Sequence, residues 1–230
     1  MRRAALAVAA LVVLFLAAGG VYLLTLPGVG DAPARADRIM AAHGESVRVR
    51  PTPARLADAV IATEDEHFDD NIVVNVVTGA GRAALAAVQA SQDPGGSTID
   101  QQLAKALYGD TGGLFGTLRQ IGLGVKLALT YSKQQILAMY LNVNYYGQGY
   151  WGVTQAAEGY FHTAPASLSW AEASMLAGLL QAPSAYDPVV HFALAKKRQR
   201  HVLDQLVANG QLTRSEAAAV YDARLPLTSS

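Results

Sequence analysis

The sequence predicts a mainly α-helical domain that lies behind a single apolar segment at the N-terminus. Three observations favour this fold class. Helical patterns recur along the chain with no convincing run of strands, several predicted helix starts carry the capping-box spacing, and an uncharged N-terminal stretch is long enough to cross a bilayer. The 230 residues suffice for one domain of ordinary size and this accessory segment.

The N-terminal segment has the features of an uncleaved, single-pass membrane anchor. Arg2 and Arg3 precede an uncharged run over 4–30, whose apolar core at 4–26 is long enough for the about 20 residues of a spanning helix. A cleavable signal peptide is the alternative, but its apolar region normally has about 7–15 residues, and the small-residue site at 34–36 lies too far downstream. The two arginines predict a cytoplasmic N-terminus and a domain outside the cytoplasmic membrane.

The chain is expected to divide into three parts. A cytoplasmic tip and transmembrane anchor at 1–27 lead into a linker at 28–53, which is rich in Pro, Gly, Ala and Arg and lacks sustained periodicity. The domain then runs over 54–230. Its helices are expected at 54–63, 80–90, 98–108 and 117–129, with further helix starts at Ser132 with Gln135, Ser169 with Glu172, Thr213 with Glu216, and Asp187 with Pro188.

The composition excludes several kinds of site. The chain has no cysteine, which fits an exported protein without disulfides and excludes thiolate metal ligands and a cysteine nucleophile. Its histidines lack a ligand spacing such as His-x-x-x-His, which argues against a zinc hydrolase. Lys plus Arg equals Asp plus Glu at 18 each, so no global basic field favours nucleic acid. The local basic run at 196–201 is interpreted as a solvated helix face, with binding to anionic lipid as the alternative.

The most informative stretch is 95–105, where a glycine turn leads into a helix start with several polar side chains. Thr98 and Gln101 have the capping-box spacing, and Thr98, Gln102 and Lys105 fall on one helix face. A hydroxyl, a carboxamide and an ammonium beside the positive end of a helix dipole suit a phosphate or pyrophosphate. A capped surface helix without a binding role has the same spacing.

A second candidate site is the acidic stretch 64–70, which carries five acids in seven positions at the end of an apolar helix. Crowded carboxylates repel one another, so at least one could have a raised pKa suited to general-base work. An acidic surface loop is the plainer alternative. Further along, 131–153 predicts a capped amphipathic helix followed by an aromatic and glycine-rich loop, a pattern that core packing most often explains.

Together these stretches resemble the peptidoglycan glycosyltransferases of glycosyltransferase family 51, which include monofunctional transglycosylases and the transglycosylase domain of class A penicillin-binding proteins. Residues 95–105 are similar to the family's Gly-Gly-Ser-Thr-Ile-x-Gln-Gln-x-x-Lys, and 64–68 to its Glu-Asp-x-x-Phe. Residues 133–142 are similar to its Lys-x-x-Ile-Leu-x-x-Tyr-Leu-Asn, and 171–184 to its final, largely structural motif. The resemblance therefore covers most of the domain.

The resemblance implies a lysozyme-like helical fold that polymerises lipid II and releases undecaprenyl pyrophosphate. Glu64 would deprotonate the 4-hydroxyl of the acceptor sugar, which attacks the donor's anomeric carbon with inversion. The region 108–118, with Leu114 and Phe115 among glycines, would dip partly into the membrane. The residues implied to shape the pocket or to stabilise the leaving pyrophosphate are Phe68, Ser97, Thr98, Gln101, Gln102, Lys105, Arg119 and Lys126.

The sequence departs from the family at the family's second functional glutamate. Counted back from Tyr131 without gaps, the family's Arg-Lys-x-x-Glu falls on 116–120, so that Gln120 stands at the catalytic glutamate position. A register anchored on Arg119 would put Leu123 there instead. Neither register keeps a carboxylate.

The missing acid leaves several readings open. Asp65 or Glu66 could compensate for it, which places Asp65 beside Glu64 and Gln120 among the candidate catalytic residues. Alternatively, activity could be low, or the chain could bind lipid II without polymerising it. A lytic transglycosylase would share the expected architecture, but it does not explain Lys105 and its pyrophosphate-like cradle.

The expected partners follow from the same resemblance. They are lipid II, the growing glycan strand and the cytoplasmic membrane, without nucleic acid. No Ser-x-x-Lys motif with a later Lys-Thr-Gly appears, so transpeptidation would come from a separate protein. No cofactor is expected to be required. A divalent cation, Mg²⁺ or Mn²⁺, at the pyrophosphate would be chemically reasonable, with Asp65 or Glu66 as its candidate ligand.

Overall fold

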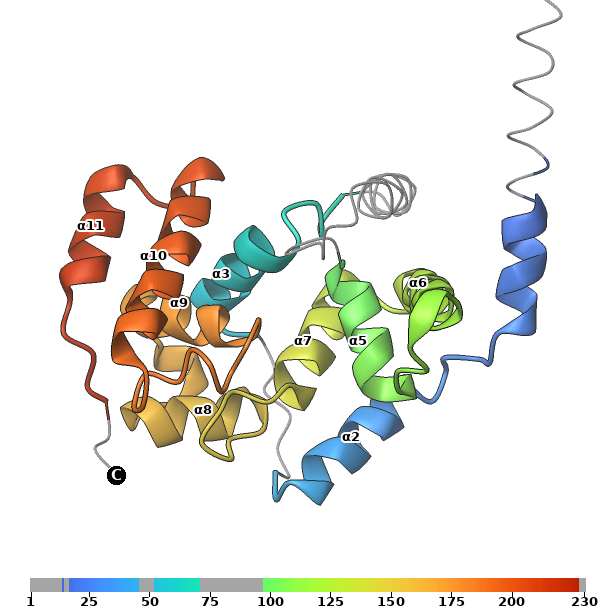
Figure 1. Cartoon of the computed structure of the whole chain (residues 1–230), viewed down its shortest axis with the longest axis horizontal. Helices are drawn as coiled ribbons and strands as arrows, with labels where there is room; N and C mark the ends of the chain where they lie inside the picture. Colours follow the sequence, from blue (N-terminus) through green and yellow to red (C-terminus); the bar gives the residue numbers. More distant parts are fainter. Residues whose placement is uncertain (1–13, 15–16, 46–51, 71–96, 228–230) are drawn as a thin grey trace, which may run out of the picture.

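The computed structural model describes residues 14, 17–45, 52–70 and 97–227. Within these ranges the chain forms α-helices and one short 3-10 helix and contains no β-strand, and an isolated bridge joins Tyr145 to Trp151. The prediction of a mainly helical fold is confirmed for this part of the chain (Figure 1). In chain order the elements are α2 (Ala32–Ala42), α3 (Ala54–Glu64), α5 (Ile99–Tyr108), α6 (Gly113–Thr130), α7 (Lys133–Val143), α8 (Gly152–Phe161), η1 (Pro165–Ser167), α9 (Trp170–Leu179), α10 (Phe192–Ala208) and α11 (Arg214–Asp222).

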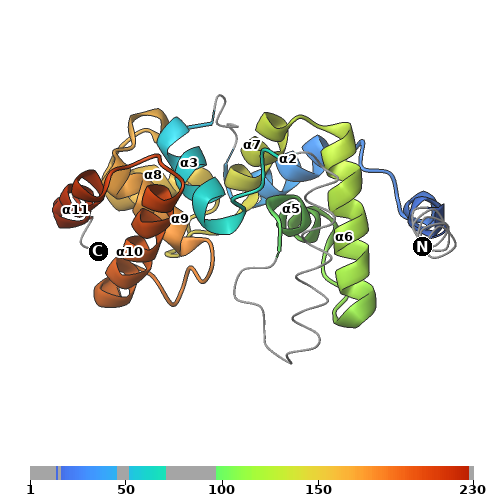
Figure 2. The ribbon, with the colours of Figure 1, turned by 90° about the horizontal axis from the view of Figure 1, so that it is seen from above.

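The helices form two packed groups with α7 between them. α3 packs against α9 and α10, and α11 packs on α10, while α5 packs against α6 and α7. Figure 2 shows the first group on one side of the molecule and α5 and α6 on the other. The C-terminal end of α3 and the N-terminal half of α5 therefore face the middle of the molecule, where the candidate residues of both groups can meet.

The predicted helix starts are built by side-chain caps. The hydroxyls of Ser132, Ser169 and Thr213 each accept the backbone N–H three residues on, and the Gln or Glu at that position accepts the N–H of the cap residue. Thr98 caps α5 by accepting the N–H of Gln101 at 3.3 Å. Because each cap satisfies an N–H that has no partner inside the helix, these helices begin where the sequence spacing predicts.

Part of the expected linker is instead a helix that belongs to the core. The prediction for 28–53 needs correction over α2, whose small residues let it pack closely and whose Pro33 fits the first turn of a helix. The composition suggested a linker because Ala and Pro are common in both settings. The spacing of the apolar residues was the better guide, since one face of the helix and the turn before it bury Val29, Ala32, Ala36 and Met40.

Two other predicted boundaries differ from the structure. α6 begins at Gly113, about one turn before the expected start, and Gly112 precedes it with a φ of 69° that glycine adopts without strain. Asp187 caps a single turn by accepting the N–H of Val189 at 2.9 Å, and α10 begins only at Phe192. The helix expected at 80–90 and the two glycines of the turn at 95–96 lie outside the described residues.

Most of the expected anchor also lies outside the described residues, although 17–25 are helical. In the ranges that the structure does cover, no helix combines the length and the apolar character needed to cross a membrane. The described end of this segment rests on α6, because the side chains of Tyr22 and Leu26 occupy the space beside Gly122.

α5 and α6 approach each other closely at Gly124. A Cβ atom at this residue would lie 3.1 Å from the backbone nitrogen of Gln101 and 3.2 Å from the carbonyl carbon of Asp100. These are backbone atoms in the first turn of α5, so they cannot rotate away as a side chain can. Glycine at this position therefore lets α6 support the start of the helix that carries the candidate binding residues.

Replacing Gly124 by valine is expected to lower the free energy of unfolding by about 1–3 kcal/mol, because the added side chain overpacks the contact between α5 and α6. Gly28→Ala is the matched control, since no atom lies within 4 Å of its added Cβ and the expected change is below about 0.5 kcal/mol. Thermal unfolding of the detergent-solubilised chain, followed by far-UV circular dichroism, measures both. A Gly124→Val protein as stable as the wild type would contradict the close contact.

Candidate active site

Glu64, the last residue of α3, lies between two helices that carry its polar partners. Its Oε1 accepts a hydrogen bond from Nη2 of Arg198 on α10 at 3.2 Å, and its Oε2 accepts one from Nε2 of Gln102 on α5 at 3.2 Å. The side chains of Glu64 and Arg198 are each only 11% exposed. The guanidinium therefore compensates the charge of a nearly buried carboxylate, and the two donors fix its orientation.

Tyr140 on α7 extends this network. Its hydroxyl donates to Oε1 of Gln102 at 2.8 Å, and the amide nitrogen of Gln102 donates to Glu64 and to the carbonyl oxygen of Ser97. Burial raises the pKa of Tyr140 well above its ordinary value, so the hydroxyl keeps the proton that it donates. The carboxamide is thereby held in one orientation, with its oxygen toward Tyr140 and its nitrogen toward Glu64.

Asp65 joins the end of α3 to the start of α5. Its buried carboxylate accepts the backbone N–H of Ile99 at 3.1 Å, beside the cap that Thr98 provides for Gln101. A carboxylate at a helix N-terminus is favoured by the helix dipole and by the free N–H groups there. Asp65 and Thr98, both expected to act in the site, thus act on the backbone and set where α5 begins.

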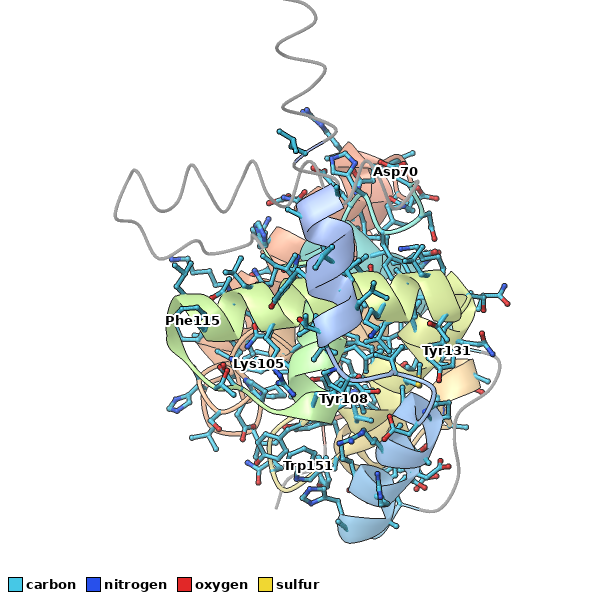
Figure 3. The ribbon with its side chains drawn as sticks, turned by 90° about the vertical axis from the view of Figure 1, so that its right-hand side faces the viewer. Asp70, Lys105, Tyr108, Phe115, Tyr131 and Trp151 are labelled. Atoms are coloured by element: carbon cyan, nitrogen blue, oxygen red, sulfur yellow. The ribbon has the colours of Figure 1, made fainter. Side chains whose placement is uncertain are left out.

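A second polar cluster lies at the other end of α5. The ammonium of Lys105 pairs with Oδ2 of Asp110 at 2.9 Å, and Gln120 on α6 donates its amide nitrogen to Oδ1 of the same carboxylate at 2.9 Å. Arg119 donates from Nη1 to the two carbonyl oxygens that end α5, at 3.2 and 3.4 Å. Lys105 is exposed at this end of the molecule (Figure 3). The cluster thus brings together the predicted residues Lys105, Arg119 and Gln120.

Two predicted substrate-binding residues have other roles in the structure. Phe68 is 1% exposed and lies in the core with the ammonium of Lys133 4.4 Å above its ring. Lys126 donates its ammonium to the carbonyl oxygens of Leu23 at 3.2 Å and Leu26 at 2.9 Å. A cation suits the carbonyl end of a helix. In this structure Phe68 packs the loop after α3 and Lys126 holds the N-terminal segment on α6, and substrate binding by either residue stays a prediction.

The sequence reasoning missed three residues of these clusters: Arg198, Tyr140 and Asp110. Arg198 belongs to the run interpreted as a solvated face, yet helical spacing puts it on the same face as the buried Ala195 and Val202. That spacing was the signal that could have found it. The pattern around Tyr140 indicates packing alone. Asp110 lies in the loop after α5, where no periodic pattern predicts its contact with Lys105.

Metal ligation receives no support from the described side chains. These residues contain no group of three or more His, Asp or Glu placed to hold a metal ion. Asp65, one of the two candidate ligands, is buried against the start of α5. The other, Glu66, is exposed and lies 3.6 Å from Nε2 of His67.

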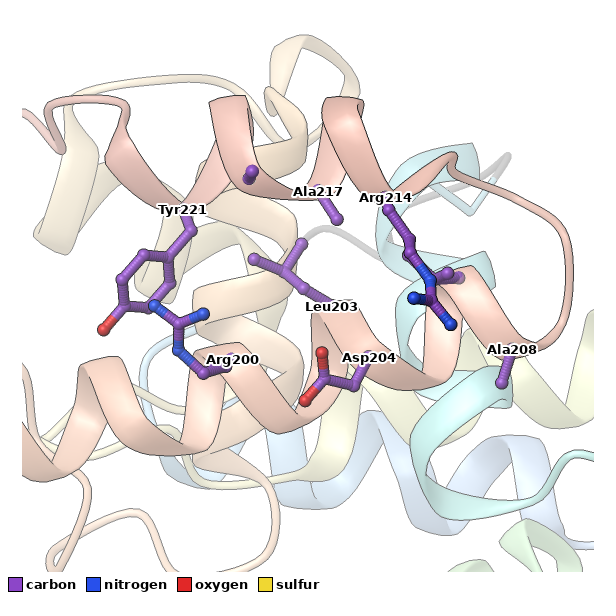
Figure 4. A pocket seen from close by; sticks show the side chains of 9 residues that line it. Arg200, Leu203, Asp204, Ala208, Arg214, Ala217 and Tyr221 are labelled. Carbon is purple, nitrogen blue, oxygen red and sulfur yellow. The ribbon is translucent and has the colours of Figure 1, made fainter.

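A separate cavity of about 470 Å³ lies between α10 and α11 (Figure 4). Arg200 lines it and lies 3.7 Å above the ring of Tyr221, with Asp204 and Arg214 nearby. Arg200 projects from a different face of α10 than Arg198, because two residues turn a helix by more than half a circle. The cavity contains none of the predicted site residues and is separate from Glu64.

Known proteins share much of this chain's sequence. The sequence model of a family described as "Transglycosylase" matches residues 34–207. Penicillin-binding protein 2a of Streptococcus pneumoniae is 38% identical over 174 residues, which cover 75% of this chain and 23% of the relative. Penicillin-binding protein 1A of Neisseria flavescens is 40% identical over 171 residues, which cover 74% of this chain and 21% of the relative.

The chain thus spans about a fifth to a quarter of the length of these curated relatives. Among solved structures, the 2.6 Å crystal structure of penicillin-binding protein 1A from Haemophilus influenzae aligns with 80% of this chain and 18% of its own, at a TM-score of 0.48 and 21% identity. The family match includes α3, α5, α7 and nearly all of α10, which are the helices that build the Glu64 network. On this match, the chain belongs to the transglycosylase family.

Proposed function

We propose that this chain is a peptidoglycan glycosyltransferase, which polymerises lipid II into glycan strands and releases undecaprenyl pyrophosphate. The hydrogen bond between Glu64 and Gln102 carries the proposal. It joins two motifs that lie 38 residues apart in the sequence, the Glu-Asp-x-x-Phe stretch and the glycine-turn helix. Membership of the transglycosylase family supports glycosyl transfer in general. The helical architecture is compatible with the lysozyme-like arrangement that the resemblance implies.

Glu64 would act as the general base of this reaction. Its carboxylate takes the proton of the acceptor's 4-hydroxyl while the hydroxyl oxygen bonds to the donor's anomeric carbon and the bond from that carbon to the pyrophosphate breaks, with inversion. Arg198 and Gln102 keep the carboxylate in one place throughout. A positioned base of this kind contributes roughly 10²–10⁴-fold to rate.

Lys105 would stabilise the negative charge that grows on the leaving pyrophosphate. Its ammonium is exposed and lies on the turn of α5 after Gln102, so it shares a helix face with the residue that orients Glu64. Arg119 supports it by holding α6 against the end of α5. Ser97 and Gln101 would complete the polar pocket at the start of the helix.

The exposed apolar residues of α6 support work at a lipid surface. Leu114 is 72% and Phe115 is 85% exposed, and both lie in the first turn of α6, close in sequence to Asp110. Figure 3 shows Phe115 on α6. Isolated apolar side chains of this size at a helix start suit insertion into a membrane interface. The proposed setting is the outer face of the cytoplasmic membrane, with the N-terminus inside and transpeptidation left to a separate protein.

The test is polymerisation of lipid II by the detergent-solubilised chain, with product length read on a gel. Wild-type protein is expected to make polymer, and Glu64→Gln to lose at least about 10²-fold in rate because the amide cannot accept the proton. Glu158→Gln, an exposed glutamate on α8, is the matched control and should keep the wild-type rate.

Polymer from the Glu64→Gln protein at the wild-type rate would overturn the role of Glu64 as base. A wild-type protein that binds lipid II but makes no polymer would overturn the proposed reaction and favour a lipid II-binding homologue. Degradation of finished glycan without any polymerisation would favour a lytic enzyme instead.

Arg198→Met is expected to lower the free energy of unfolding by about 3 kcal/mol, because it leaves the nearly buried Glu64 carboxylate without its counter-ion. In a Glu64→Gln background the same change should cost less, since the uncharged amide needs no counter-ion. Arg200→Met removes the arginine above Tyr221 on another face of α10 and is the matched control. Urea unfolding curves of the wild type, the three single variants and the double variant measure these differences, and equal costs of Arg198→Met in both backgrounds would contradict the ion pair.

A further inference from the structure

The carboxylate of Asp110 is held by three donors at the end of α5. Its Oδ2 pairs with Lys105 at 2.9 Å, and its Oδ1 accepts from the backbone N–H of Gly112 and from the amide nitrogen of Gln120, each at 2.9 Å. The hydrogen bond from Gly112, followed by that from Lys105, holds the pKa of Asp110 below its ordinary value. Asp110 is therefore a fixed negative charge beside the lysine proposed to bind the pyrophosphate.

Gln120 and Asp110 complement each other chemically. Gln120 stands where the resemblance places the family's second glutamate, and its amide nitrogen donates directly to Asp110. A glutamate at position 120 could not donate, and it would bring a second carboxylate within about 3 Å of the first, where like charges repel. One negative charge therefore lies beside Lys105, but it comes from Asp110 in the loop after α5 and not from position 120 on α6.

We propose that Asp110 is the positioning carboxylate of this site, and that it supplies from the loop between α5 and α6 the charge that Gln120 lacks. The inference rests on the proposed function and deepens it. The long side chain of Lys105 has many rotamers, and its ion pair with Asp110 selects the one that keeps the ammonium beside α6. Because Lys105 is 56% and Asp110 39% exposed, a pyrophosphate can reach the ammonium without displacing a buried group.

A set of four variants tests whether Asp110 supplies the negative charge that a glutamate at position 120 would supply. In lipid II polymerisation, Asp110→Asn is expected to lower the rate at saturating substrate roughly tenfold, and Gln120→Glu to lower it because two carboxylates then crowd Lys105. The double variant Asp110→Asn with Gln120→Glu returns the single charge to α6 and should recover to within roughly threefold of the wild type. Asp110→Asn with Gln120→Ala restores no charge and should stay slow. Asp204→Asn, in the separate cavity, is the control for loss of an exposed carboxylate.

Chemical modification of Lys105 gives a second readout that does not depend on polymerisation. Acylation requires the amine of Lys105 to reach the reagent, and the ion pair with Asp110 holds that amine against the loop. Asp110→Asn should therefore speed acylation of Lys105, measured by peptide mass spectrometry, by roughly two- to fivefold. Adding Gln120→Glu should slow it again, whereas a role of Asp110 in capping the loop alone would leave the second substitution without effect.

The outcomes separate this inference from the proposed function. If the double variant stays as slow as Asp110→Asn in polymerisation, the proposed role of Asp110 is wrong, although the protein is still a polymerase. If the wild type makes no polymer, the proposed function fails. The modification data then decide by themselves whether Asp110 positions Lys105. Unchanged Lys105 reactivity in Asp110→Asn then overturns the inference, and faster acylation that Gln120→Glu reverses upholds it.

Discussion

Removing a carboxylate from water carries a desolvation cost that only opposite charge and hydrogen bonds offset, and Glu64 meets this constraint with Arg198 and Gln102. Because these partners come from α10 and α5, the requirement ties together helices from both groups of the fold. Tyr140 adds α7 by fixing the orientation of the Gln102 amide. The catalytic proposal therefore depends on the packing of α3, α5, α7 and α10, and a shift of any of them would disturb the carboxylate.

α5 is the element that this packing positions most tightly at both ends. Its first turn is held by the carboxylate of Asp65, capped by Thr98 and backed by Gly124 of α6. Its last carbonyl oxygens accept hydrogen bonds from Arg119. Several residues that a sequence motif presents as ligands thus act as supports, and the supports hold Gln102 and Lys105 on one face of a short helix.

The two polar clusters along α5, one around Glu64 and one around Lys105, differ in how far their ion pairs are exposed to water. Around Glu64 the groups are nearly buried, so the ion pair with Arg198 is shielded from water and orients the carboxylate. Around Lys105 the ion pair with Asp110 is exposed, where such a pair is worth little and can exchange for a better anion. This contrast suits the proposed roles, since the proposed base must stay in one orientation and the proposed pyrophosphate ligand must be able to exchange its partner. The replacement of a family glutamate by Gln120 is compatible with it, since Asp110 keeps one negative charge in the cluster.

The sequence by itself determined the helical fold class, the starts of α3, α5, α7, α9 and α11, and the two motifs that carry Glu64 and Lys105, because caps, turns and periodicity are local properties. It misjudged α2, where composition outweighed the spacing of small apolar residues. Tertiary structure alone decided that Phe68 packs in the core, that Lys126 binds carbonyl oxygens of the N-terminal segment, that Arg198 pairs with Glu64 and that Asp110 pairs with Lys105. These roles depend on which helices meet in space, and contacts between residues far apart in the sequence leave no periodic signal within either segment.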